Sequence, residues 1–165
     1  MASTGDVVPA RRGFLKALVV APAGALVLVP RAEATDYASA REVMDTVDRL
    51  EADVAARLGA IARAVPRAQP FAGSVLADFE RHRAVRARLR RRLGLPASAA
   101  PSVVTKDAGL EPLRAAQEAL VYAHAEGLPA LGDAHAVDAM ARNMVELSRH
   151  LAVIGLWIES ESERG

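Results

Sequence analysis

The sequence predicts an all-α protein, in which a bundle of four helices follows an N-terminal targeting segment. The chain has 165 residues, of which 52% are hydrophobic, and this is enough apolar material for one core. Beyond residue 36, apolar residues recur at alternating spacings of three and four, which is the period of an amphipathic helix. A short pattern also occurs twice, and this indicates two copies of one helical unit.

The repeated pattern is an acid, a large apolar residue, any residue, Arg, His, any residue, Ala and Val. It begins at Asp78 in the first copy and at Glu146 in the second. The two histidines, His82 and His150, lie 68 positions apart, each four residues after the acid of its own copy. We therefore expect two similar helical hairpins.

A second similarity lies upstream of each histidine. Glu51 precedes His82 by 31 residues, and Glu118 precedes His150 by 32. Each predicted hairpin therefore offers one glutamate on its first helix and one acid-and-histidine pair on its second.

Residues 1–34 have the composition of a targeting segment. A basic start precedes an uncharged apolar run over residues 17–29, and a small-x-small pattern follows it. The segment resembles a bacterial twin-arginine export signal through Arg11, Arg12, Phe14, Leu15 and Lys16, with Ala32 and Ala34 before the cleavage point. The run of 13 residues is short for a membrane span, which needs about 20. An uncleaved signal that anchors the protein in a membrane remains the alternative.

The resemblance implies export of an already folded protein by the twin-arginine machinery, into the periplasm or cell envelope. That route often carries proteins that hold a cofactor or travel with a partner protein. Residues 35–165 would then form the mature domain, with a net charge of −1 in place of +1, since the segment holds four basic and two acidic groups. This charge does not favour nucleic acid as a partner. The absence of cysteine excludes disulfides and thiolate metal sites.

The first helix is predicted over residues 37–65. Its apolar stripe has spacings of three and four and consists of Val43, Val47, Leu50, Val54, Leu58, Ile61 and Val65. Glu51 lies beside this stripe. Pro66 ends the helix and Pro70 begins the next, so the connection is short and makes the two helices antiparallel neighbours.

The second helix is predicted over residues 71–93, with Gly94 as its C-terminal cap. His82 falls near the middle of its apolar face. Arg86 lies on the same line and needs an acidic partner if it is buried. Seven arginines occur between residues 81 and 92. We interpret this row as a solvated helix face near the C-terminus of the helix rather than as a docking surface.

The stretch 96–106 is rich in Pro, Ala and Ser and has no periodicity. Extended, its 11 residues would reach about 35 Å, whereas a turn between antiparallel neighbours needs only about two to eight residues. The length predicts a crossover along the bundle, with the second and third helices parallel. The topology would then be up-down-down-up.

The third helix is predicted to begin between residues 107 and 112 and to end near Gly127, with His124 as a core residue. The fourth is predicted from Asp133, its N-cap, to about residue 159. Its stripe alternates three and four and consists of Val137, Met140, Met144, Leu147, Leu151, Ile154 and Ile158. Glu146 and His150 lean toward the flank of this stripe.

A duplicated hairpin with one glutamate and one acid-and-histidine pair resembles the ferritin-like superfamily, whose bundles enclose two metal ions. The resemblance implies that iron or manganese would be held by Glu51, His82, Glu118 and His150. Asp78 and Glu146 lie four residues before the histidines, a spacing at which an acid and a histidine can share a metal ion, and they are added as candidate ligands. The sequence departs from the family motif at one repeated place. The carboxylates expected three residues before each histidine are replaced by Phe79 and Leu147. In the other interpretation, each acid-and-histidine pair forms a helix-surface or inter-helix hydrogen-bonded contact without metal.

Three functions follow as hypotheses. The first is a non-enzymatic envelope protein whose bundle binds a partner or small molecule. The second is a metal-binding oxidase-like or storage protein. The third is an accessory subunit exported with a cofactor-bearing protein partner, which would show an apolar patch on its outer face. The sequence offers neither a serine–histidine nucleophile motif nor a Gly-rich phosphate loop.

Overall fold

The computed structural model of the chain describes residues 19–20, 26–27, 37–99 and 108–163. Helix α1 runs over Ala40–Ala64. It begins at Ala40 because Ser39 is an N-cap whose hydroxyl accepts from the backbone N–H of Glu42, at 3.3 Å. The Glu42 carboxylate reaches back and accepts from the backbone N–H of Ala38 at 2.9 Å. Two backbone donors at the helix start are thereby satisfied.

A short 3₁₀ turn, η1 (Pro66–Ala68), joins α1 to α2 (Gln69–Arg92). Helix α2 begins two residues earlier than predicted because Pro70 lies within its first turn, where the missing N–H has no intrahelical partner. Gly94 ends the helix in the left-handed conformation, with φ of 67°. The backbone N–H of Leu95 then donates to the carbonyl of Arg90 at 2.8 Å.

Helix α3 (Leu110–Gly127) is followed by a second 3₁₀ turn, η2 (Leu128–Leu131), and by α4 (Ala134–Ser162). Asp133 is the N-cap of α4, as predicted, and its carboxylate accepts from the backbone N–H of Ala136 at 2.9 Å. The backbone reverses at Gly132, whose φ is 65°. The predicted four helices are confirmed.

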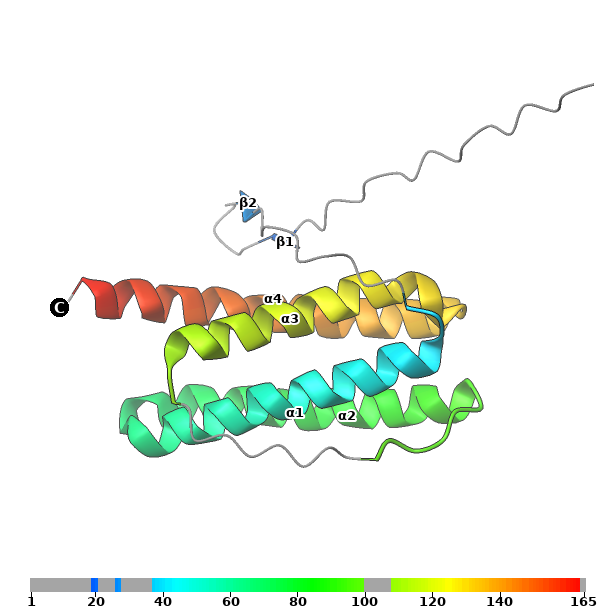
Figure 1. The fold of residues 1–165 in the computed structure, drawn as a ribbon, viewed down its shortest axis with the longest axis horizontal. Helices are drawn as coiled ribbons and strands as arrows, with labels where there is room; N and C mark the ends of the chain where they lie inside the picture. The colour runs from blue at the N-terminus through cyan, green and yellow to red at the C-terminus, as the bar shows by residue number, and fades with distance from the viewer. Residues whose placement is uncertain (1–18, 21–25, 28–36, 100–107, 164–165) are drawn as a thin grey trace, which may run out of the picture.

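The four helices form a bundle in which α1 and α4 each pack against both α2 and α3. The pairs α1–α4 and α2–α3 lie across the diagonals (Figure 1). In Figure 1, α1 and α4 run from right to left, and α2 and α3 run from left to right. Helices adjacent in the bundle are therefore antiparallel. The end of α2 and the start of α3 lie at opposite ends of the bundle, and residues 100–107 between them are outside the described ranges.

Two short strands, β1 (Val19–Val20) and β2 (Leu26–Val27), pair antiparallel, and β1 lies against α4. The residues predicted to form the export signal and its cleavage point lie outside the described part of the chain: Arg11, Arg12, Phe14, Leu15, Lys16, Ala32 and Ala34. Within the described ranges, the search for a helix with the length and apolarity of a membrane span found none.

The hydrophobic core runs along the bundle axis, and all four helices contribute to it. The predicted stripe of α1 is confirmed, since Val43, Val47, Val54, Leu58 and Ile61 are buried. The buried face of α4 differs from its predicted stripe. It consists of Ala136, Met140, Asn143, Leu147, His150 and Ile154. The prediction that His150 leans toward the flank was wrong, because the polar residues Asn143 and His150 share the buried side.

Helices α1 and α3 approach closely at Gly127, where a Cβ atom would overlap the Cγ1 atom of Val43. We expect Gly127→Ala to destabilise the bundle by about 1–3 kcal/mol, because it overpacks this crossing. Gly73→Ala is the matched control, since a Cβ atom there meets nothing within 4 Å. It should stabilise the protein by up to about 1 kcal/mol through helix propensity. Urea unfolding followed by circular dichroism measures both, and equal effects would contradict the crossing described.

Candidate functional site

The centre of the bundle holds an arginine that is almost fully buried. The Arg86 side chain on α2 is 1% exposed, and its guanidinium contacts two acids of α1. Its Nη1 donates to Oε2 of Glu51 at 2.9 Å, its Nη2 donates to Oε1 of Glu51, and its Nε donates to Oδ1 of Asp48 at 2.6 Å. Glu51 is itself 1% exposed. The expectation that a buried Arg86 needs an acidic partner is confirmed.

One turn further along α2, Arg90 repeats the arrangement. Its Nη2 donates to Asp45 at 2.7 Å and to Asp48 at 2.8 Å, and its Nη1 donates to the carbonyl of Pro96 at 3.3 Å. The interpretation of the arginine row as a solvated face was therefore wrong for Arg86 and Arg90, which are both buried. The remaining five arginines of the row are exposed. The physical reason is that α1 presents Asp45, Asp48 and Glu51 toward α2.

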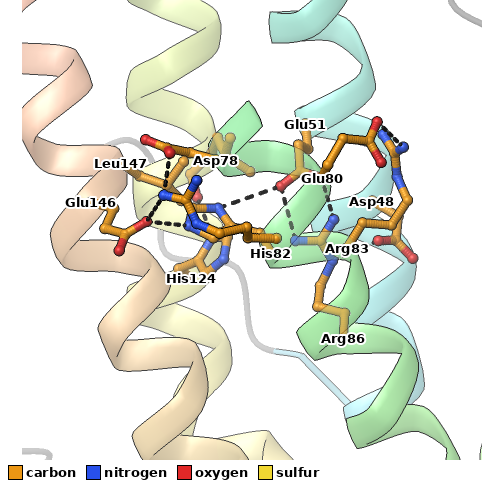
Figure 2. Close-up of polar contacts among 12 residues, drawn as sticks. Asp48, Glu51, Asp78, Glu80, His82, Arg83, Arg86, His124, Glu146 and Leu147 are labelled. Carbon is orange, nitrogen blue, oxygen red and sulfur yellow. Dashed lines mark hydrogen bonds and ion pairs between the residues drawn. The ribbon is translucent and has the colours of Figure 1, made fainter. Parts of the chain in front are cut away.

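The acid-and-histidine pairs of the repeat bond across the two copies rather than within them. The Nε2 atom of His82 on α2 lies 2.9 Å from Oε2 of Glu146 on α4 (Figure 2). The Nε2 atom of His150 on α4 lies 2.9 Å from Oδ2 of Asp78 on α2. We call these two contacts the crossed pairs. They confirm inter-helix hydrogen bonds of the acids and histidines, and they join the two hairpins reciprocally.

The crossed pairs and the buried arginines form one continuous chain of polar side chains. The Nδ1 atom of His82 lies 3.8 Å from Oε2 of Glu51, which links the Arg86 ion pair to the first crossed pair. Arg81 bonds to Asp78 and lies 3.8 Å from Glu146, which links the two crossed pairs to each other. The chain leads from Asp45 near the start of α1 to His150 in the middle of α4.

Hydrogen bonding assigns the tautomer of each buried histidine, because an acceptor atom can only take a proton. His82 and His150 each donate from Nε2 to a carboxylate, and His124 donates from Nδ1 to the carbonyl of Leu120 at 2.9 Å. The other ring nitrogen of each is buried and has no hydrogen-bond partner among the described residues. In the neutral ring it carries a lone pair. This is the orientation that metal-binding histidines also adopt, with the second nitrogen held by a carboxylate or carbonyl.

The predicted metal ligands fall into three places. Glu51, His82 and Glu146 lie in the middle of the chain of polar side chains, and Asp78 and His150 lie at its α4 end. Glu118 lies apart from them and accepts from Arg114 of its own helix at 2.9 Å. Phe79 and Leu147, which stand at the family's carboxylate positions, are buried in the core. Within the described residues, no three acids or histidines are grouped so as to hold a metal ion. The metal site stays a prediction.

Several polar residues that lie in the interior or pair with a buried arginine were not among the predicted site residues: Asp45, Asp48, Arg90, Gln117 and Asn143. A signal for the first three was present in the sequence. Acids spaced by three on the first helix can face arginines spaced by four on an antiparallel neighbour. Gln117 carried no such signal. Its amide Nε2 donates to the carbonyl of Leu147 at 2.9 Å across α3 and α4, a contact that depends on the final packing.

The surroundings decide the charge of the central groups. Burial alone would raise the pKa of Glu51, but the nearby His82 and the hydrogen-bonded guanidinium of Arg86 outweigh it and hold the pKa below its ordinary value. Burial lowers the pKa of His124 to about 4, so this ring is neutral at pH 7. The site therefore contains the buried carboxylate of Glu51, which stays ionised, and the buried ring of His124, which stays neutral at pH 7.

Comparison of the chain with models of protein families, with curated proteins and with solved structures gave no match.

Removal of one partner of the buried ion pair should be costly. We expect Arg86→Met to destabilise the protein by about 3–5 kcal/mol, because Glu51 would remain buried without its cation. Arg88→Met is the matched control on the same helix, since Arg88 is exposed, and its effect should stay within about 0.5 kcal/mol. Urea unfolding at pH 7 measures both. A small loss for Arg86→Met would show that the ion pair is replaceable.

Acidification should lower the free energy of unfolding, because His124 binds a proton more readily in the unfolded chain than in the folded protein. Its pKa is about 4 in the folded protein and about 6.5 in the unfolded chain, so the unfolded chain binds the additional proton as the pH falls from 6.5 to 4. Stability should drop by about 3 kcal/mol over this window on account of His124. The variant His124→Gln should lose that component, whereas His135→Gln, at an exposed position of α4, should keep it. Unfolding free energies at several pH values measure the difference, and identical slopes for the two variants would refute it.

Proposed function

We propose that this chain is an exported, non-enzymatic helical-bundle protein that acts by binding a protein partner in the cell envelope through the outer face of α4. The proposal has three supports: the N-terminal segment, the paired carboxylates of Glu51, Asp78 and Glu146, and the exposed apolar residues of α4. The export step rests on the resemblance of residues 11–16 to a twin-arginine signal.

We further propose that the bundle has the ferritin-like up-down-down-up topology. The parallel directions of α2 and α3 and their diagonal placement support it (Figure 1). In a bundle of this kind the central residues commonly bind metal. In this chain the guanidinium of Arg86 lies against Glu51, so a protein cation stands beside a carboxylate that could otherwise bind a metal ion.

The interior favours a scaffold over an open reaction site. Glu51 is held by Arg86, and Glu146 and Asp78 are held by histidines of the opposite hairpin. A carboxylate that accepts such charge-assisted bonds is fixed in place and less available to a substrate. Metal binding at Glu51 and His82 is the alternative, and elemental analysis of the purified protein beside His82→Ala decides between the two.

The observation that carries the proposal is the position of the exposed large hydrophobic residues. Within the described part of the chain there are three, Val145, Val153 and Leu156, and all three lie on α4. Leu156 is 64% exposed. Single exposed apolar residues are ordinary, but their concentration on one helix favours a protein contact there. An accessory subunit exported with its partner, the third hypothesis, would use such a patch.

Site-specific photo-crosslinking in cells of the source organism tests the proposal. A photo-reactive amino acid at position 156 should form a defined crosslinked protein species, because this position lies within the proposed contact. The same amino acid at position 119, an exposed alanine of α3, is the matched control and should form none. Equal crosslinking at both positions, or none at either, would refute a partner site on α4.

A further inference from the structure

The outer face of α4 carries a regular seam of residues. Positions 145, 149, 152, 156, 159 and 163 are spaced four, three, four, three and four, which is the heptad spacing of a coiled-coil seam. The residues are Val145, Arg149, Ala152, Leu156, Glu159 and Glu163. All are exposed except Ala152, which is half-buried. The seam spans about 27 Å at about 1.5 Å per residue.

This seam is complementary to itself in the antiparallel direction. A two-fold axis that passes α4 at residue 154 pairs position 152 with 156, 149 with 159, and 145 with 163, because each pair is symmetric about 154. Leu156 of each copy would then contact Ala152 of the other copy, and these two symmetry-related contacts would form the apolar centre of the interface. Arg149 would lie on Glu159 of the second copy, also twice. The same axis places Val145 opposite Glu163 at the ends of the seam.

Two charged residues of the seam, Arg149 and Glu159, lack a partner within the part of the chain that the structure describes. Arg142 of the same helix, by contrast, pairs with Asp138. Ten residues separate Arg149 from Glu159, which is about 15 Å along the helix and too far for a direct contact. A second, antiparallel copy would bring each to the other's charge.

We propose that the chain forms a symmetric homodimer through this seam, with antiparallel α4 helices around residue 154. The proposal rests on the proposed function, in that it identifies the partner of α4 as a second copy of the chain. A partner with only one sign of charge would leave either Arg149 or Glu159 facing a like charge. An anionic lipid surface would likewise be repelled by Glu159 and Glu163.

Charge reversal tests the pairing directly. Sedimentation velocity of the full chain over a concentration series should show a monomer–dimer equilibrium. With Arg149→Glu, a glutamate at position 149 would face Glu159 of the other copy. With Glu159→Arg, an arginine at position 159 would face Arg149 of the other copy. Each substitution should weaken the dimer by about tenfold or more. The double variant, with both charges exchanged, should dimerise again. Arg88→Glu, the same charge change at an exposed position of α2, is the matched control and should leave the dimer unchanged.

Mixing the two single variants is the sharpest arm of the experiment. A chain with Arg149→Glu and a chain with Glu159→Arg present complementary charges to each other at both ends of the seam. The equimolar mixture should therefore form a heterodimer although each variant alone stays monomeric. Only the proposed register, with 149 opposite 159, gives this rescue.

Three results would overturn the homodimer: a full chain that stays monomeric at the highest concentration reached, single variants that dimerise like the unaltered chain, or a mixture without rescue. Crosslinking at position 156 separates this failure from failure of the proposed function. A crosslink from position 156 to a different protein would keep the partner site on α4 and exclude a second copy as its occupant. The lack of any crosslink, together with a monomeric chain, would exclude both.

Discussion

The buried ion pair between Arg86 and Glu51 is the interaction on which the arrangement of the bundle depends. Desolvation of two charges is expensive, and an apolar pair of equal volume is often as stable. What the ion pair adds is directional restraint, since a guanidinium bonded at both oxygens of Glu51 and at Asp48 accepts only one register of α2 along α1. The acid of that pair also lies beside His82, so the register set by α1 and α2 extends to α4 through Glu146.

The helices could be predicted well from the sequence because their signals are local. Alternating apolar spacings, the Asp133 cap and the glycine and proline boundaries each act within a turn or two of the chain. Helix α2 begins at Gln69, two residues earlier than predicted, and the two 3₁₀ turns occupy the short connections between predicted helices. Boundaries of this kind depend on small differences in capping.

The partners of the interior residues could be predicted only in part. A sequence can show that Arg86 falls on an apolar face and needs an acid, but which acid supplies the charge depends on how α1 and α2 align. The crossed pairs were harder still, because Asp78 and His82 lie close in sequence and were natural partners of each other. Packing of α2 against α4 directs each toward the opposite hairpin instead.

The crossed pairs make the two hairpins chemically interdependent. Asp78 and His82 of one hairpin are completed by His150 and Glu146 of the other, so either hairpin alone would leave a histidine and an acid without their partners. The two hairpins therefore contact each other as two subunits of a dimer would, with equivalent bonds in both directions. Here both hairpins belong to one covalent chain, so these bonds form without a second molecule.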